Sequence, residues 1–199
     1  MTFDLKKSFL LFLLLGVMCM INTYGCAEGF KYERYSGNDP ELNFTLDYIS
    51  GWLHSEQTGS KNSFYQVVFY EPAGKDQLSM VSMTVTVEKS QNLEINPLTL
   101  DTKAEDILSR RLKFKDAQIV SKDKKNILGL PAWDIKLSYQ TLNKPYSINA
   151  KLLPVMERII IFKRKDKFYT LRYENKVEEF DKFSKAFDRL VNSLKFKDK

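Results

Sequence analysis

Apolar and polar side chains alternate along many stretches of this chain, and that alternation constrains the fold more than any other feature. A period of two places every second side chain on the same face of a β-strand. Residues 42–48 follow this pattern and lead into a turn at Gly51-Trp52. The same pattern, or a run of aromatic and β-branched residues, predicts further strands over residues 64–70, 79–88, 117–122, 133–139, 147–153, 157–163 and 167–174.

Two segments instead repeat apolar residues at helical spacing. Near the C-terminus one predicted helical stripe holds Val177, Phe180, Phe183, Phe187, Leu190, Val191 and Leu194. An earlier helix is predicted to end near Phe114, on the spacing of Ala104, Ile107, Leu108 and Leu112. Thr102, followed three residues later by Glu105, matches a capping box and marks the predicted start of that earlier helix.

The predicted order is several strands, one helix, several strands and a second helix, joined by short connections. Hairpin connections are predicted at residues 71–74 and 164–166. This order favours the α+β class, with two main helices packed on a mostly antiparallel β-sheet. The sequence lacks the glycine-rich fingerprint of a doubly wound nucleotide-binding fold. No repeat or linker divides residues 28–199, so we predict a single domain there.

Residues 1–27 have the order of parts of a secretory signal peptide, with two lysines, an apolar run and a small-residue cleavage zone. The apolar run is shorter than the ~20 residues that a membrane-spanning helix needs. Two outcomes stay open. Gly25 and Ala27 suit cleavage before Glu28, whereas Thr23-Tyr24-Gly25-Cys26 resembles the box of bacterial lipoproteins, in which the cysteine is lipidated. We expect an exported protein, in the periplasm or on the outer face of a membrane, either soluble or anchored through Cys26.

The mature chain offers little chemistry for catalysis or metal binding. Both cysteines, Cys19 and Cys26, lie in the signal segment, so no thiol or disulfide is expected in the domain. His54 is the sole histidine, and the sequence places no nucleophile or carboxylate partner beside it, which favours a surface histidine. A zinc or copper site built almost entirely from carboxylates would suit neither metal. We therefore expect no cofactor, no metal and no enzymatic activity.

The formal net charge is +6, and about +5 without the signal segment. This dispersed excess does not indicate nucleic acid, and anionic lipids or cell-wall polymers are the acidic surfaces that an exported protein meets. Three basic clusters stand out: residues 110–115, the group Lys122, Lys124 and Lys125, and the group Lys163, Arg164, Lys165 and Lys167. If the last two groups share one end of the sheet, they form a cationic edge for an anionic membrane or partner. The alternative is that these lysines only discourage aggregation at strand ends.

Two other sets of residues have a functional and a structural interpretation. Trp52 and Trp133 could form a ligand-stacking pocket, although tryptophans at such positions are more often part of the core. Asp101, Glu105 and Asp106 could bind a hard cation, but negative charge in a first helical turn also complements the helix dipole. We favour the structural interpretation of both sets.

Four passages carry motifs of turns and core aromatics. They are Phe44-Thr45-Leu46-Asp47-Tyr48-Ile49-Ser50-Gly51-Trp52, Val67-Val68-Phe69, Gly129-Leu130-Pro131-Ala132-Trp133, and Phe168-Tyr169-Thr170-Leu171 with the closing helix to Leu194. Together they resemble the PsbP-like superfamily, whose fold is shared by the photosystem II subunit PsbP, Ran-binding Mog proteins and many bacterial exported proteins. Ile49 stands where the family motif has proline. The resemblance implies a PsbP/Mog-like α/β/α sandwich and a non-enzymatic binding role. It does not imply a role in photosynthesis.

The leading hypothesis is a non-catalytic exported protein that binds another protein or an anionic envelope component. The alternative is a carrier of a small apolar ligand held between the sheet and the C-terminal helix, suggested by the aromatic-rich strands. A third hypothesis, an exported hydrolase, predicts a pair of buried, mutually close carboxylates in a cleft.

Overall fold

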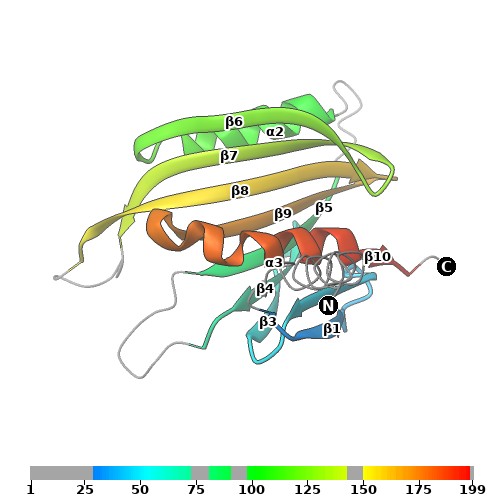
Figure 1. Cartoon of the computed structure of the whole chain (residues 1–199). Coiled ribbons are helices and arrows are strands. Elements are labelled where there is room, and N and C mark those ends of the chain that lie inside the picture. Colours follow the sequence, from blue (N-terminus) through cyan, green and yellow to red (C-terminus); the bar gives the residue numbers. More distant parts are fainter. Residues whose placement is uncertain (1–28, 73–80, 91–97, 143–149, 198–199) are drawn as a thin grey trace, which may run out of the picture. The chain divides into compact units, whose positions relative to one another are not determined.

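Strands dominate the fold, and their hydrogen bonding arranges them in two antiparallel sheets (Figure 1). The computed structural model describes residues 29–72, 81–90, 98–142 and 150–197, of which those from Tyr32 onward belong to one unit. The larger sheet holds, in spatial order, β3 (Leu53–Thr58), β4 (Tyr65–Tyr70), β5 (Ser82–Lys89), β9 (Lys167–Lys176), β8 (Leu152–Arg164), β7 (Leu130–Leu142) and β6 (Lys115–Ile127). The smaller sheet holds β1 (Tyr32–Ser36), β2 (Phe44–Ile49) and β10 (Lys195–Phe196).

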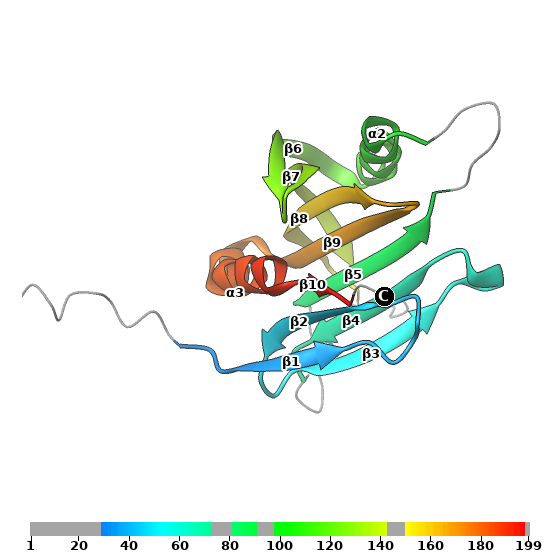
Figure 2. The same cartoon turned by 90° about the vertical axis from the view of Figure 1, so that its right-hand side faces the viewer.

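The two helices lie on opposite faces of the seven-stranded sheet, as Figure 2 shows for α2 (Leu100–Arg111) and α3 (Phe180–Ser193). Ala104 and Leu108 of α2 pack in one buried cluster with Ile159 of β8. The preceding residue in β8, Arg158, points to the other face and reaches Asp188 of α3. The predicted α+β class, with two helices on a mostly antiparallel sheet, is confirmed, and so are the α/β/α layers.

The smaller sheet covers the same face of the larger sheet as α3, beyond the helix. The Tyr35 ring of β1 lies edge-on to the Phe69 ring of β4, with centroids 5.3 Å apart. Arg189 of α3 donates two hydrogen bonds to Asp47 of β2, at 2.8 and 3.0 Å. This face of the larger sheet is therefore covered by α3 and by a second layer of strands.

The predicted apolar faces form the core. In β2 and just before it, the alternate residues that point inward are all buried: Leu42, Phe44, Leu46 and Tyr48. In α3, Phe183, Phe187 and Leu190 are buried, and the rings of Phe180 and Phe187 lie 4.7 and 5.7 Å from the ring of Tyr173 in β9. Each such side chain contributes roughly 1.5–3 kcal/mol to stability.

The predicted cap of α2 is wrong by one helical turn. The N-cap is Thr99, whose side chain accepts a hydrogen bond from the backbone N–H of Thr102, while Thr102 Oγ1 accepts one from the backbone N–H of Thr99. Thr102 therefore occupies the third helical position, where it completes the box that Glu105 was expected to complete. A threonine can replace Glu or Gln at that position because its hydroxyl can also accept a hydrogen bond from the N-cap N–H.

Several element boundaries also differ from the sequence prediction. Helix α2 ends at Arg111, because a turn at residues 112–114 leads directly into β6, and Leu112 is exposed. Val177 is exposed in a short 3₁₀ turn, η2 (Val177–Glu179), and is not part of the apolar stripe. Strand β8 is continuous over its 13 residues, whereas the sequence predicted a break near Pro154, which is tolerated at its exposed N-terminal end.

Three strands and one 3₁₀ turn were not predicted at all: β1, β3, β10 and η1 (Ser60–Asn62). The predicted hairpin tip at residues 164–166 is confirmed. The predicted signal segment, residues 73 and 74 of the predicted connection and the start of the strand predicted over 147–153 lie outside the described residues.

The position of the α2 cap can be tested by substitution. We expect Thr99→Ala to lower the free energy of unfolding in urea by about 1 kcal/mol, because a helix N–H loses its acceptor. Glu105→Gln is the matched control and should change it by less than about 0.5 kcal/mol, since its ion pair with Lys122 is exposed. A larger loss for Glu105→Gln than for Thr99→Ala would contradict the observed cap.

Candidate functional site

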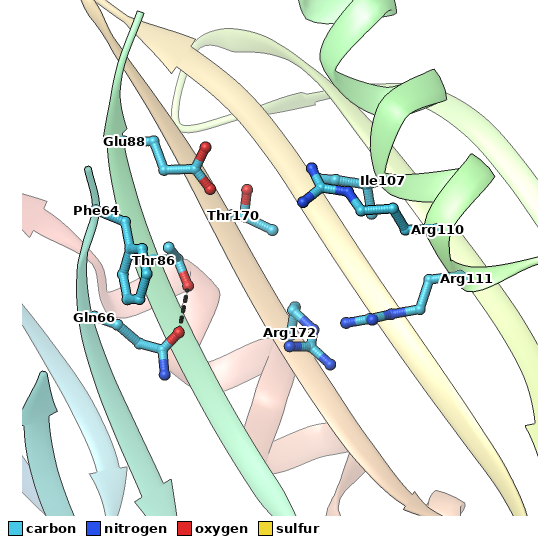
Figure 3. Close-up of a pocket in the computed structure, with 9 residues that line it drawn as sticks. All are labelled: Phe64, Gln66, Thr86, Glu88, Ile107, Arg110, Arg111, Thr170 and Arg172. Atoms are coloured by element: carbon cyan, nitrogen blue, oxygen red, sulfur yellow. Dashed lines mark hydrogen bonds between the residues drawn. The ribbon is translucent and has the colours of Figure 1, made fainter. Parts of the chain in front are cut away.

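The face of the large sheet that carries α2 is only partly covered by that helix. An open groove of about 240 Å³ lies between α2 and strands β4, β5 and β9 (Figure 3). Its lining residues come from the helix and from these strands and their ends: Ile107, Arg110, Arg111, Phe64, Gln66, Thr86, Glu88, Thr170 and Arg172. With three guanidinium groups among nine side chains, the groove is rich in hydrogen-bond donors.

Glu157 holds two of the three groove arginines. It lies in β8 on the face that α2 covers, and its side chain is 0% exposed. Arg111, in the last turn of α2, donates to it through Nε at 2.7 Å and through Nη2 at 3.2 Å. Arg172 of β9 also donates to Glu157. A buried carboxylate is tolerated only when such bonds replace its water, so both arginines are fixed relative to the sheet.

Tyr139 and Glu174 extend this network. The Tyr139 hydroxyl lies 3.0 Å from Glu174 Oε2 and 3.3 Å from Glu157 Oε2, so it can donate to either carboxylate. Burial raises the pKa of Glu174 above its ordinary value, and the negative charge of Glu157 raises it further, against the opposing effect of Arg172. Burial likewise raises the pKa of Tyr139, which keeps the phenol a neutral donor.

Glu157 and Glu174 are thus a pair of close, largely buried carboxylates of the kind that the hydrolase hypothesis predicts. Their contacts favour a structural role. Neither is among the residues that line the groove, and both oxygens of Glu157 accept hydrogen bonds from arginine. A carboxylate with both oxygens engaged and no access to solvent has no route to a substrate. The pair serves as the counter-ions of the arginines.

The rest of the groove is also organised by polar pairs. Glu88 binds the ammonium of Lys103, which is itself buried, and Arg110 pairs with Asp106 one helical turn earlier. The Thr86 hydroxyl donates to Gln66 Oε1 at 3.1 Å, the bond drawn as a dashed line in Figure 3. The polar side chains of the groove are therefore positioned before any ligand arrives.

The two basic groups singled out in the sequence lie toward one end of the large sheet, with Lys122 the farthest from that end. The turn between β6 and β7 joins Ile127 to Leu130, and the turn between β8 and β9 joins Arg164 to Lys167. Because Ala132 pairs with Phe162, both turns lie at the same end, on the right in Figure 1. We call this the cationic end, made of Lys122, Lys124, Lys125, Lys163, Arg164, Lys165 and Lys167.

Most residues of the cationic end contact an acid or an aromatic ring. Lys122 pairs with Glu105, Lys124 with Asp101 at 3.4 Å, Lys125 with Asp134 at 2.6 Å, and Lys167 with Glu41 at 2.5 Å. Lys163 lies over the ring of Phe168, and the guanidinium of Arg164 lies 4.1 Å from the ring centroid of Phe196. Lys165 is exposed at the hairpin tip, with a positive φ of 54°.

The two tryptophans do not share a pocket. Trp52 is buried against Phe183 of α3, as expected for a core residue. Trp133 is half-buried on the opposite face, where the ammonium groups of Lys122 and Lys124 lie 4.8 and 4.9 Å from its ring centroid. Its indole N–H donates to Asp101 at 2.8 Å. Trp133 therefore organises the cationic end.

The remaining candidates have ordinary surroundings. His54 is exposed on β3, edge-on to the rings of Tyr35 and Tyr48. Asp101, Glu105 and Asp106 are each paired with a basic residue. At the interface between α3 and the sheet, where an apolar ligand was the alternative hypothesis, the aromatic side chains of α3 are buried. Cys26 lies outside the described residues.

Among the residues that the structure describes, no helix has the length and apolarity needed to cross a membrane. Within the same part of the chain, no group of three or more His, Cys, Asp or Glu side chains is placed to hold a metal ion.

Sequence reasoning singled out Arg110 and Arg111 within a basic cluster but missed the groove itself. It also missed Arg172 of the groove and the carboxylates that hold the arginines, Glu157 and Glu174, which lie on strands that only the fold brings together. One signal was available: Glu157 stands between Val155 and Ile159 at alternate positions of an apolar strand face. A charged residue at such a position indicates a buried ion pair.

The counter-ion role of Glu157 predicts a large effect on stability. We expect Glu157→Gln to lower the free energy of unfolding by about 3–5 kcal/mol, because Arg111 and Arg172 would lose a buried partner. Glu178→Gln, at an exposed position in η2, should change it by less than about 0.5 kcal/mol. Denaturation in urea measures both, and similar small losses would contradict the assigned role.

The raised pKa of Glu174 predicts a pH dependence. Because the folded state favours its protonated form, its stabilising contribution is complete below its ordinary pKa of 4.5 and is lost as pH rises through the higher folded value. The wild type should therefore lose stability relative to Glu174→Gln as pH rises from 4.5 toward neutrality. Unfolding free energies of both proteins across that range provide the measurement, and a constant difference would contradict the prediction.

Comparisons with known proteins agree with this architecture. Residues 29–196 match the family model described as PsbP-like protein, and no curated protein sequence matches the chain. The cyanobacterial PsbP (CyanoP) of Synechocystis is similar in structure, with a TM-score of 0.55 and 14% identity over 89% of this chain and 99% of that one.

Two further solved structures share the fold. The Ran-binding protein Mog1p of Saccharomyces cerevisiae has a TM-score of 0.52 and 12% identity, covering 85% of this chain and 97% of its own. LpqN of Mycobacterium tuberculosis, involved in cell envelope biogenesis, has a TM-score of 0.50 and 12% identity, covering 87% and 97%. At these identities the likeness concerns the fold, whereas the family match spans nearly the whole chain. The chain belongs to the PsbP-like protein family.

Proposed function

We propose that this protein is an exported, non-catalytic binding protein of the cell envelope, which docks through its cationic end on another protein or on an anionic envelope component. The observation that supports the proposal is the register of β7 and β8, because the β6–β7 and β8–β9 turns share one end of the sheet and each is close to one of the two basic groups. Basic residues from both hairpins can thereby contribute to the attraction of one anionic surface.

An exposed ion pair at this end leaves its lysine able to interact with an anionic surface. Lys124 and Asp101 are 67% and 62% exposed, and exposed pairs of this kind contribute only about 0–1 kcal/mol. A dense anionic surface can therefore replace such partners at little cost. The Trp133 ring keeps Lys122 and Lys124 side by side, which reduces the side-chain freedom lost on docking.

Export supports an envelope setting. The proposed signal segment, residues 1–27, precedes a proposed single domain over residues 28–199. Lipidation of Cys26 would hold the cationic end near a membrane, whereas cleavage before Glu28 would release it. The intact mass of the exported protein distinguishes the two products, because only the first carries a diacylglycerol.

The comparisons support the class of function. Mog1p is a Ran-binding protein, and LpqN is involved in cell envelope biogenesis. Protein binding and an envelope role are therefore both found on this fold, and we extend them to this chain by analogy. The engaged state of Glu157 gives no support to catalysis at the groove.

The docking surface can be tested with a charge-neutralised variant. We expect the wild type to retain acidic components of envelope extracts and to lose them as salt is raised, since exposed charges are screened. The variant Lys124→Gln/Lys163→Gln/Lys165→Gln should retain several-fold less. These positions leave the buried partner of Lys125, Asp134, undisturbed.

A matched control removes the same charge elsewhere. Lys113→Gln/Lys182→Gln/Lys185→Gln alters three exposed lysines outside the cationic end and should bind as the wild type does. Sedimentation with anionic and neutral vesicles tells whether a lipid surface suffices. Equal retention by both triple variants would contradict the proposal.

A further inference from the structure

The groove arginines keep donors available for a ligand. Figure 3 shows Arg110, Arg111 and Arg172 extending into the space between α2 and the strands. Within the described residues, the hydrogen bonds of Arg111 and Arg172 use Nε and Nη2. A guanidinium has five N–H donors, so the Nη1 groups remain for an oxygen ligand.

Two of the groove arginines have their counter-ions outside the lining of the groove. The counter-ions of Arg111 and Arg172 are Glu157 and Glu174, which do not line the groove. Among the described residues that line it, the one carboxylate is that of Glu88, which is bound to Lys103. Arg111 and Arg172 are therefore already held in place by carboxylates outside the lining of the groove, so less side-chain entropy is lost when they bind a ligand.

The groove also has an apolar part and a small volume. Phe64 and Ile107 line it from opposite sides, and both are partly buried. Its volume of about 240 Å³ is below the ~300–1,000 Å³ usual for drug-sized ligands. The ligand must accordingly be small and must offer both an oxyanion and a short hydrocarbon portion.

We propose that this groove is a binding site for a small organic acid, whose carboxylate is held by Arg110, Arg111 and Arg172 and whose apolar portion lies against Phe64 and Ile107. Planar guanidinium forks match a carboxylate in a bidentate geometry. The hydroxyls of Thr86 and Thr170 and the amide of Gln66 offer further hydrogen bonds. This site is separate from the cationic end and is independent of docking there.

Titration of the purified protein with hexanoate, followed by amide NMR, tests the site. We expect saturable shifts centred on Gln66, Thr86 and Thr170, and no such response to hexan-1-ol, which lacks the carboxylate. Arg110→Gln should weaken hexanoate binding about tenfold, the effect of one lost charge-assisted hydrogen bond. Arg110 is exposed and pairs only with its neighbour in the helix among the contacts described, so this variant should fold normally.

Control variants separate this site from others. Lys185→Gln, on α3 across the sheet, and the triple variant of the cationic end should both bind hexanoate as the wild type does. Ile107→Ala should weaken hexanoate binding more than acetate binding, because only hexanoate reaches the apolar wall. The proposal is overturned if hexanoate gives no saturable shifts at the groove, if hexan-1-ol or inorganic phosphate binds there as well as hexanoate, or if Arg110→Gln has no effect.

Discussion

Strand β8 is covered on both faces, and each charged side chain in its middle must therefore find its partner inside the fold. Glu157 faces α2 and is neutralised by Arg111 and Arg172. Its neighbour Arg158 faces α3, where it binds Asp134 through two hydrogen bonds of 2.9 Å and Asp188 through one of 2.6 Å. Two adjacent residues thus tie both helices to one strand, and neither can lose its partners without leaving a buried charge unpaired.

The two faces of the sheet are covered to different extents, and the groove follows from that difference. On one face, α3 and the three-stranded sheet lie over β3, β4, β5, β8 and β9. On the other face, α2 packs on β7 and β8. The groove lies next to α2, where the helix no longer covers the sheet. Arg111 lines this groove, and its ion pair with Glu157 holds the last turn of the helix against the sheet. The counter-ion that stabilises the fold also positions the donors of the groove.

Sequence periodicity predicted the strands and helices in which one whole face is buried. It failed for elements whose buried residues form no regular pattern. The alternation at residues 42–48 and the stripe of α3 correspond to buried faces, so their side chains reveal them. Strand β3 is an edge strand with exposed or half-exposed residues throughout, and therefore carries no such pattern. The groove joins residues from α2, β4, β5 and β9, and its arginine pairs depend on strand register, which no local pattern encodes. The α2 cap was misplaced because the local rule requires a Glu or Gln three residues after the cap, which Thr102 has and Thr99 has not, whereas the observed box uses the Thr102 hydroxyl.

The two basic surfaces use different residues, and the difference matches what each can do. Six of the seven residues of the cationic end are lysines, whose compact, hydrated ammonium groups attract a broad anionic surface with little geometric demand and a strong dependence on salt. The groove uses arginines, two of which are fixed by Glu157, and fixed planar forks recognise one oxyanion in a defined orientation. A partner held at the cationic end and an acid held in the groove would therefore respond differently to ionic strength. The first should dissociate as salt is raised, while the second should persist further because its contacts are partly shielded from solvent.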